Sequence, residues 1–165
     1  MGVSFSVENV NRSALPCSQT DGMRYTIAGE SVGPADLLAR GTDLTATLYL
    51  HEFSFGKFFW NFDAVPGYDY ATTLARRGHV SIIVDRLGYD QSGHPPGDKS
   101  CLGGQADIAS QIARQLKAGT YTAESRAPIR FERIVLAGHS VGAGIAELAT
   151  HSFPDLDIAG LLIFA

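Results

Sequence analysis

Short apolar segments alternate with longer polar, glycine-rich ones along most of the chain. Runs of apolar or β-branched residues predict strands, and apolar residues spaced three or four apart predict helices. The predicted strands are Val3–Val7, Arg24–Ala28, Thr45–Leu50, Val80–Asp85, Ile134–Ala137 and Ile158–Phe164. The predicted helices are Tyr70–Arg77, Gly104–Ala118 and Val141–His151. The expected loops, each interrupted by Gly or Pro, are Gly33–Gly41, His51–Asn61 and Arg86–Cys101.

Strands that alternate with helices predict a mostly parallel, doubly wound sheet. Val3–Val7 and Arg24–Ala28 follow one another without a helix, so we expect an antiparallel hairpin at the N-terminal edge of that sheet. The fold class is therefore α/β, in a single domain over residues 1–165. In such sheets the active site lies beyond the carboxyl ends of the strands. The segments that follow Leu50, Asp85 and Ala137 are thus where chemistry is expected.

The composition fits one globular domain with enough apolar material for a core, since 45% of its 165 residues are hydrophobic and 18% are charged. A net charge of −4 without basic clusters argues against nucleic acids and anionic membranes as partners. No apolar run reaches the roughly 18 residues of a membrane span. The first residues also lack the charged and apolar regions of a signal peptide. The cellular compartment stays open.

The two cysteines, Cys17 and Cys101, both lie in polar, loop-like surroundings. They are compatible with a disulfide in an oxidising compartment and equally with two free thiols in the cytosol. Neither has the further Cys or His neighbours of a zinc site. His51-Glu52 lacks the second histidine of an H-E-x-x-H motif. We therefore expect no metal and no cofactor.

The most informative motif is Gly138–Gly142, which reads G-H-S-V-G between a predicted strand and a predicted helix. A G-x-S-x-G pentapeptide in this setting is the pattern of a nucleophile elbow. The sharp turn leaves no room for side chains two positions to either side of the serine, which explains both glycines. Ser140 would then stand clear of the sheet, beside N–H groups of a helix N-terminus that can hold an oxyanion. The alternative is an ordinary glycine-rich turn.

Three motifs together resemble the α/β-hydrolase family, in particular its single-domain, esterase- and lipase-like members. They are the strand and loop Leu48–Phe53, the segment Ile83–Gly93 and the elbow Gly138–Gly142. The resemblance covers nearly the whole chain and implies a partial α/β-hydrolase fold. Glu52 and Asp90 stand where the family usually has glycine. Relatives of this kind are often secreted, although nothing in this sequence directs export.

The resemblance also implies roles for individual residues. Ser140 would be the nucleophile, and the backbone N–H groups of Val141 and Phe53 would hold the oxyanion, with Ser54 as an alternative to Phe53. His51 is expected to brace the loop rather than to act as a base, and His139 to pack beside the elbow. The substrate pocket is expected to include His51, Ser54, Phe55 and His139. An apolar acyl pocket is expected from Phe53, Phe55, Phe58, Phe59 and Trp60, although each of these is equally compatible with ordinary core.

A serine at the elbow favours acyl transfer through an acyl-enzyme, because family members that open epoxides or remove halide use Asp there. The expected substrate is a small-molecule ester with an apolar acyl group. Cyanohydrin lyases and cofactor-free peroxidases also use this serine and stay open. A catalytically inactive hydrolase fold that acts as a binding or interaction module is the alternative function.

The general base and the acid of a triad are not apparent. In this family they follow the serine in the order acid, then histidine, yet His151 and the nearby carboxylates are expected at the opposite edge of the sheet. His79 is expected on that edge too, and His94 is the only spare candidate. The chain therefore resembles the N-terminal two-thirds of a hydrolase. Ile158–Phe164 would be an open apolar edge strand through which the chain self-associates.

Overall fold

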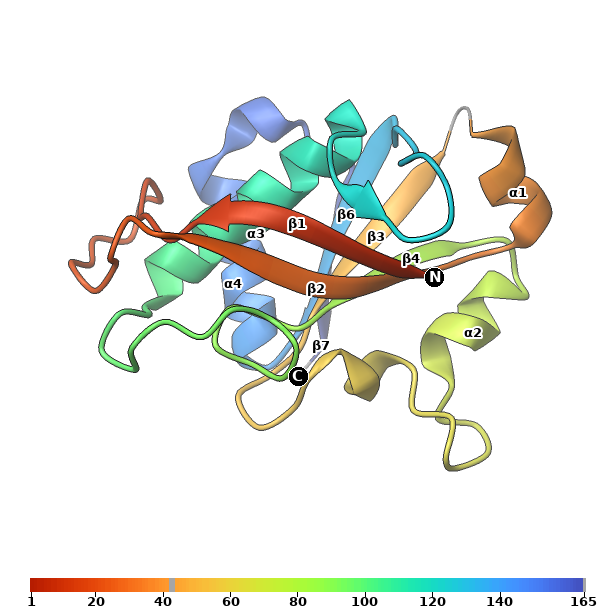
Figure 1. Cartoon of the computed structure of the whole chain (residues 1–165), viewed down its shortest axis with the longest axis horizontal. Helices are drawn as coiled ribbons and strands as arrows, with labels where there is room; N and C mark the ends of the chain where they lie inside the picture. Colours follow the sequence, from red (N-terminus) through yellow and green to blue (C-terminus); the bar gives the residue numbers. More distant parts are fainter. Residues whose placement is uncertain (42–43, 165) are drawn as a thin grey trace.

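The computed structural model describes residues 1–41 and 44–164, and within these ranges the strands form one seven-stranded sheet in the order β5-β1-β2-β4-β3-β6-β7 (Figure 1). The strands are β1 (Gly2–Glu8), β2 (Arg24–Val32), β3 (Thr45–Leu50), β4 (Val80–Val84), β5 (Thr122–Ala123), β6 (Arg133–His139) and β7 (Gly160–Phe164). The helices are α1 (Ala35–Arg40), α2 (Tyr70–Ala75), α3 (Leu102–Ala118) and α4 (Val141–Ser152). Two short 3₁₀ turns are η1 (Lys57–Trp60) and η2 (Pro154–Leu156).

The centre of the sheet is parallel, as the sequence predicts. β3 pairs in parallel with both β4 and β6, and β6 pairs in parallel with β7. β1 and β2 form the expected antiparallel hairpin, and β2 continues antiparallel to β4. The hairpin is not the edge, however, because β5 pairs with β1 outside it. Two residues are too few to show a strand periodicity, so β5 could not be predicted.

The side chains of the central strands alternate between two apolar layers, as the pleat of a sheet requires. Leu48 and Ile82 belong to a large core beneath α3 and α4. Tyr49 and Ile83, their neighbours in sequence, belong to a smaller cluster that includes Ala71 of α2. α3 and α4 thus cover one face of the sheet and α2 the other (Figure 1). This doubly wound arrangement confirms the predicted fold class.

Two connecting regions differ from the expectation. The expected loop Gly33–Gly41 contains α1, which buries Leu38 and ends at Gly41 in the left-handed conformation. The short helix carries too few apolar residues for a periodic signal. β2 extends four residues beyond Ala28, since its second half pairs with β4.

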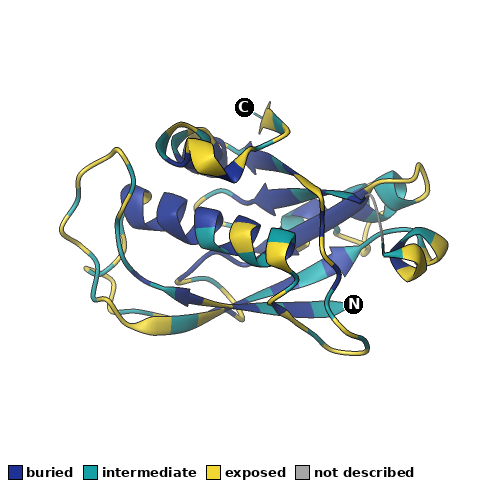
Figure 2. Cartoon of the chain, turned by 90° about the horizontal axis from the view of Figure 1, so that it is seen from above, coloured by how far each residue is buried: buried dark blue, intermediate teal, exposed yellow. Residues whose placement is uncertain are grey.

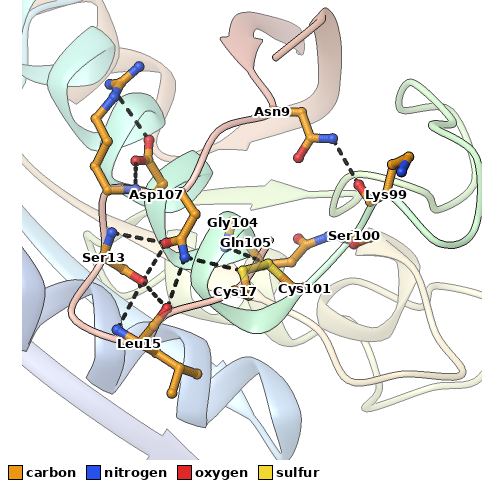
Figure 3. The surroundings of a disulfide bond; sticks show 12 residues. Asn9, Ser13, Leu15, Cys17, Lys99, Ser100, Cys101, Gly104, Gln105 and Asp107 are labelled. Atoms are coloured by element: carbon orange, nitrogen blue, oxygen red, sulfur yellow. Dashed lines mark hydrogen bonds and ion pairs between the residues drawn. A yellow bond between two sulfur atoms is a disulfide. The ribbon is translucent and has the colours of Figure 1, made fainter. Parts of the chain in front are cut away.

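Cys17 and Cys101 form a disulfide in the structure, which decides between the two readings of these residues (Figure 3). The bond joins the segment before β2 to the N-cap of α3, where the Cys101 sulfur accepts a hydrogen bond from Gly104 N. The backbone N–H of Arg12 donates to Asp107 Oδ2 at 2.7 Å in the same region. Residues 103–110 of α3 are all buried, since this half of the helix packs against the sheet and α4 (Figure 2). A disulfide between residues 84 positions apart lowers the conformational entropy of the unfolded chain. This stabilises the folded protein by up to about 4–5 kcal/mol.

β7 is the least covered strand of the sheet. Leu161, Leu162 and Ile163 are 37%, 43% and 53% exposed, so that most of the strand near the C-terminus is drawn as exposed in Figure 2. Among the described residues, β7 pairs only with β6. Within the same ranges, no helix has the length and apolarity needed to cross a membrane.

Candidate active site

Ser140 occupies a strained position between β6 and α4. Its φ of 52° and ψ of −118° lie outside the regions that side chains normally allow, at a cost of about 1–3 kcal/mol. A Cβ on Gly138 would lie 2.1 Å from Gly142 O, and a Cβ on Gly142 would lie 2.2 Å from Leu50 O. Only glycine fits at either position. The side chain of Ser140 is exposed. The pentapeptide therefore has the geometry of a nucleophile elbow.

The backbone N–H groups of Val141 and Phe53 have no acceptor within the described ranges. Val141 is the first residue of α4, so its N–H has no intrahelical partner. Phe53 follows β3, and the close approach of Gly142 to Leu50 O and His51 O brings that loop against the start of α4. Ser54 N, by contrast, donates to Glu52 Oε1 at 3.4 Å. Among the described residues, the N–H groups of Val141, Gly142 and Phe53 are thus without an acceptor, whereas that of Ser54 is engaged.

His51 braces the loop after β3. Its Nδ1 lies 2.7 Å from Glu52 O, and its Nε2 accepts the Arg86 N–H at 3.0 Å. Arg86 Nε in turn donates to His51 O at 2.9 Å. Burial, with a smaller contribution from the positive charge of Arg86, lowers the pKa of His51 to about 4. The ring is therefore neutral at pH 7, with Nδ1 as donor and Nε2 as acceptor.

The expectation that His51 lines the substrate pocket needs correction, because the residue has no exposed surface. Both ring nitrogens face the backbone of the two loops that they join. The sequence places a histidine at the end of β3 but does not show which way its ring turns.

A buried ion pair holds the same loop to the end of β4. Asp85 is fully buried and accepts from the backbone N of Lys57 at 2.7 Å and from its Nζ at 2.9 Å. Lys57 Nζ also donates to Gln91 Oε1 at 3.1 Å. Removing one partner of such a pair leaves an uncompensated buried charge, which costs about 3–5 kcal/mol. The sequence analysis assigned no role to Lys57. The feature that could have indicated one is its position as a single lysine within a phenylalanine-rich loop.

An aromatic cavity of about 370 Å³ lies next to the elbow. We define it by its six ring-bearing lining residues, which are Phe59, Trp60, Tyr68, Tyr70, His139 and Phe164. Three of these were candidates from the sequence, namely Phe59, Trp60 and His139. Tyr68, Tyr70 and Phe164 were missed, because they lie on segments that only the folded sheet brings together.

The other pocket candidates lie elsewhere. Phe55 stacks on Phe59 with ring centroids 5.1 Å apart but does not line the aromatic cavity. Phe58 is 48% exposed, and Phe53 lines a separate cavity of about 200 Å³ with Arg86. Ser54 is exposed in the loop and also lies outside the aromatic cavity. The apolar wall beside the elbow is therefore made by fewer of these residues than the sequence suggested.

No described residue forms a hydrogen bond with the Ser140 hydroxyl. His79 and His151 are exposed at positions away from the elbow, and His94 contacts Asp90 O at 3.0 Å. Among the residues that the structure describes, no group of three or more His, Cys, Asp or Glu side chains is arranged to hold a metal ion. The described site thus consists of a strained, exposed serine, nearby backbone N–H groups without acceptors among the described residues, and an aromatic wall.

Comparisons with known proteins fit this geometry. No protein-family model and no curated protein sequence matches the chain. Solved structures do match, and among them are epoxide hydrolases, esterases and a phospholipase. The chain has the α/β-hydrolase fold. An epoxide hydrolase from Vigna radiata matches with a TM-score of 0.58 at 16% identity, over 90% of this chain and 38% of its own.

Two bacterial esterases match similarly. The esterase from Exiguobacterium antarcticum has a TM-score of 0.60 at 18% identity, over 95% of this chain and 44% of its own. The esterase from Thermogutta terrifontis has a TM-score of 0.58 at 20% identity, over 96% of this chain and 44% of its own. The chain thus spans less than half the length of these α/β-hydrolase structures. At such identities the likeness establishes the fold and not the substrate.

Proposed function

We propose that the chain is a serine hydrolase of carboxylic esters with an apolar acyl group, acting through an acyl-enzyme on Ser140. The observation that carries the proposal is the strained, exposed Ser140 next to two N–H groups without acceptors among the described residues. A serine at this turn supports acyl transfer, whereas opening an epoxide by the familiar route needs a carboxylate nucleophile.

The proposed reaction has two halves. Ser140 Oγ attacks the ester carbonyl, its proton leaves to an acceptor, and the carbonyl oxygen becomes an oxyanion beside Val141 N and Phe53 N. The alcohol then departs with a proton, leaving an ester on Ser140 that water hydrolyses to the free acid. Each oxyanion donor of this kind lowers the barrier by roughly 3–4 kcal/mol.

The acceptor of the serine proton is not a described side chain. His51 is excluded because its Nε2 already accepts the Arg86 N–H and its surface is fully buried. In this form of the chain the proton goes to solvent, so turnover of an activated ester is expected to be slow by roughly 10⁴–10⁶-fold compared with a complete triad.

A second candidate function follows from a different observation, the absence of a described base hydrogen-bonded to Ser140. The described histidines His51 and His94 contact other groups and not the serine. This favours a binding module that has the hydrolase fold but does not turn over a substrate. The two candidates differ in whether Ser140 reacts with an electrophile.

Covalent labelling with a fluorophosphonate tests the proposal. We expect the folded protein, incubated for hours at mildly alkaline pH, to gain the mass of one probe, and Ser140→Ala to gain none. Ser54→Ala is the matched control, because it removes an exposed hydroxyl from the neighbouring loop and should leave labelling intact. A folded protein that gains no mass, or labelling that survives Ser140→Ala, would favour the binding module.

A further inference from the structure

Arg86 connects the segment after β4 to two consecutive carbonyl groups of the loop after β3. Its Nε donates to His51 O at 2.9 Å, and its Nη2 donates to Glu52 O at 3.1 Å. The guanidinium group is planar and rigid, so two of its N–H groups can hold two neighbouring oxygens at once. Within the described ranges, every hydrogen bond that this side chain donates goes to the loop after β3.

The Arg86 side chain is itself held in place. The residue is only 4% exposed, and its Cζ lies 4.5 Å from the centroid of the Tyr89 ring. Its own backbone N–H donates to His51 Nε2 at 3.0 Å. The His51 and Tyr89 rings also meet edge-on, with centroids 4.8 Å apart. A guanidinium group fixed in this way can impose its geometry on the carbonyl groups that it holds.

The hydrogen bonds at Glu52 O decide which way the next N–H group points. Glu52 O lies 2.7 Å from His51 Nδ1 and also accepts from Arg86 Nη2, so both of its lone pairs are engaged. The peptide bond between Glu52 and Phe53 is trans. In a trans peptide the C=O and N–H groups point in opposite directions. The Phe53 N–H therefore points away from the guanidinium group and from the His51 ring.

The opposite orientation of this peptide unit would be unfavourable for two reasons. The Phe53 N–H would face the Arg86 guanidinium and the His51 Nδ1–H, which are donors in the neutral ring's tautomer and in any arginine. Both of these buried donors would also lose the carbonyl oxygen that accepts from them. The structure thus selects one orientation, in which the Phe53 N–H has no acceptor among the described residues. Donors fixed before the reaction are what stabilises a developing oxyanion.

We propose that Arg86 is a positioning residue for an oxyanion donor. It orients the peptide unit that carries the Phe53 N–H, so that this group is free for the oxyanion formed on attack by Ser140. The inference rests on the proposed function, in which Phe53 N is one of the donors. Arg86 acts through Glu52 O, which lies 34 positions away in the sequence. A side chain that binds distant backbone atoms leaves no pattern in the sequence.

Arg86→Lys separates the two-oxygen contact from the charge. Lysine keeps the positive charge, but its single ammonium group lacks the planar fork that holds two consecutive carbonyls. We expect fluorophosphonate to label Ser140 roughly tenfold to a hundredfold more slowly in this variant, because loss of a whole oxyanion donor costs about 10²–10³-fold. The gain of mass over time measures the rate. A folded variant labelled at the wild-type rate would overturn the proposal.

Two controls distinguish positioning from a general loss of stability. Ile112→Val removes one methylene group from the core beneath α3 and lowers stability without touching the loop. Arg114→Lys makes the same exchange at an exposed arginine, which pairs with Asp155 at 2.8 Å. Both variants should be labelled at the wild-type rate. If Ile112→Val slowed labelling as much as Arg86→Lys, the effect would be one of stability and the proposal would be wrong.

Chemical rescue provides a readout that a merely structural role would not produce. Arg86→Ala vacates the place of the guanidinium group beside a cavity of about 200 Å³. Added ethylguanidinium should restore part of the labelling rate, and ethylammonium, which carries the same charge without the fork, should not. Equal rescue by both cations would contradict the proposal. Tyr89→Leu is a milder test that leaves Arg86 in place, and loss of its ring should also slow labelling.

Failure of this inference and failure of the proposed function are distinguishable, because the peptide can be followed without labelling. The NMR coupling between the amide and α protons of Phe53 reports its φ, which we expect to change in Arg86→Lys and not in Arg114→Lys. A labelled protein in which Arg86→Lys changes neither the rate nor this coupling would refute the positioning role alone. A protein that is never labelled, but whose coupling changes in Arg86→Lys, would refute the hydrolase alone.

Discussion

Among single residues, His51 illustrates how a histidine close to the proposed nucleophile can have a purely structural role. Both of its ring nitrogens hold backbone groups, and its surface is fully buried. Protonation would turn Nε2 from an acceptor into a donor facing the Arg86 N–H, so the charged form is incompatible with this arrangement. The neutral ring thus helps to hold the loop after β3 to the segment after β4.

This arrangement predicts a pH-dependent stability. The pKa of His51 falls from 6.5 in the unfolded chain to about 4 in the folded protein. The unfolded state therefore binds more protons between these values, and the free energy of unfolding should decrease as the pH falls from about 6.5 to about 4. The loss is of the order of 3 kcal/mol. Urea unfolding at pH 7 and pH 4.5 measures it.

His51→Gln isolates the contribution of this residue, because an amide can donate and accept without titrating. The variant should lose less stability than the wild type over the same pH range. His151→Gln, at an exposed position of α4, serves as the control and should follow the wild type. Parallel pH profiles for wild type and His51→Gln would contradict the assignment.

At the scale of elements, the site depends on how closely the first turn of α4 approaches the end of β3. That approach sets the position of Phe53 N relative to Val141 N, and it is possible only because residue 142 has no side chain. Glycine is not required at position 144 of the same helix, because an added Cβ there would have no atom within 4 Å.

The two glycines of α4 should therefore respond in opposite directions to alanine. Gly142→Ala places its Cβ 2.2 Å from the backbone oxygen of Leu50, and we expect it to destabilise the protein by about 1–3 kcal/mol or more. Gly144→Ala should stabilise it by roughly 0.5–1 kcal/mol through helix propensity. Urea unfolding of both variants measures the difference. Shifts of the same sign would show that the contact between α4 and β3 is looser than described.

At the scale of the whole molecule, the sheet presents an apolar strand at one side. Three consecutive residues of β7, Leu161 to Ile163, are each more than a third exposed. An exposed, apolar edge strand offers unpaired N–H and C=O groups to another strand. We propose that this form of the chain associates with a second copy through β7.

Self-association is tested by sedimentation velocity over a range of protein concentrations. The average mass should rise with concentration, and Leu162→Lys should lower it, because a charge on the strand opposes pairing. Met23→Lys is the control, since Met23 is 60% exposed and precedes β2 instead of lying on β7. A wild-type protein that stays monomeric at every concentration would refute the proposal.

Features that depend on local sterics and periodicity were predictable from the order of residues alone. The strand predicted over Thr45–Leu50 has the same bounds as β3. The sharp turn predicted over Gly138–Gly142 is present, with Ser140 in a strained conformation. These features follow from neighbouring residues, whose side-chain alternation and lack of Cβ atoms can be seen directly in the sequence. The parallel centre of the sheet followed from the order of strands and helices.

Contacts between distant segments, by contrast, became apparent only in the folded chain. The pairing of β4 with β2 and β3 brings Lys57 to Asp85 and Arg86 to His51. The end of β7 brings Phe164 to the rings of η1 and α2. These contacts depend on which strands become neighbours and which way each side chain turns at a sheet edge. Local pattern carries no information on either, because the same apolar residues satisfy any order that buries them.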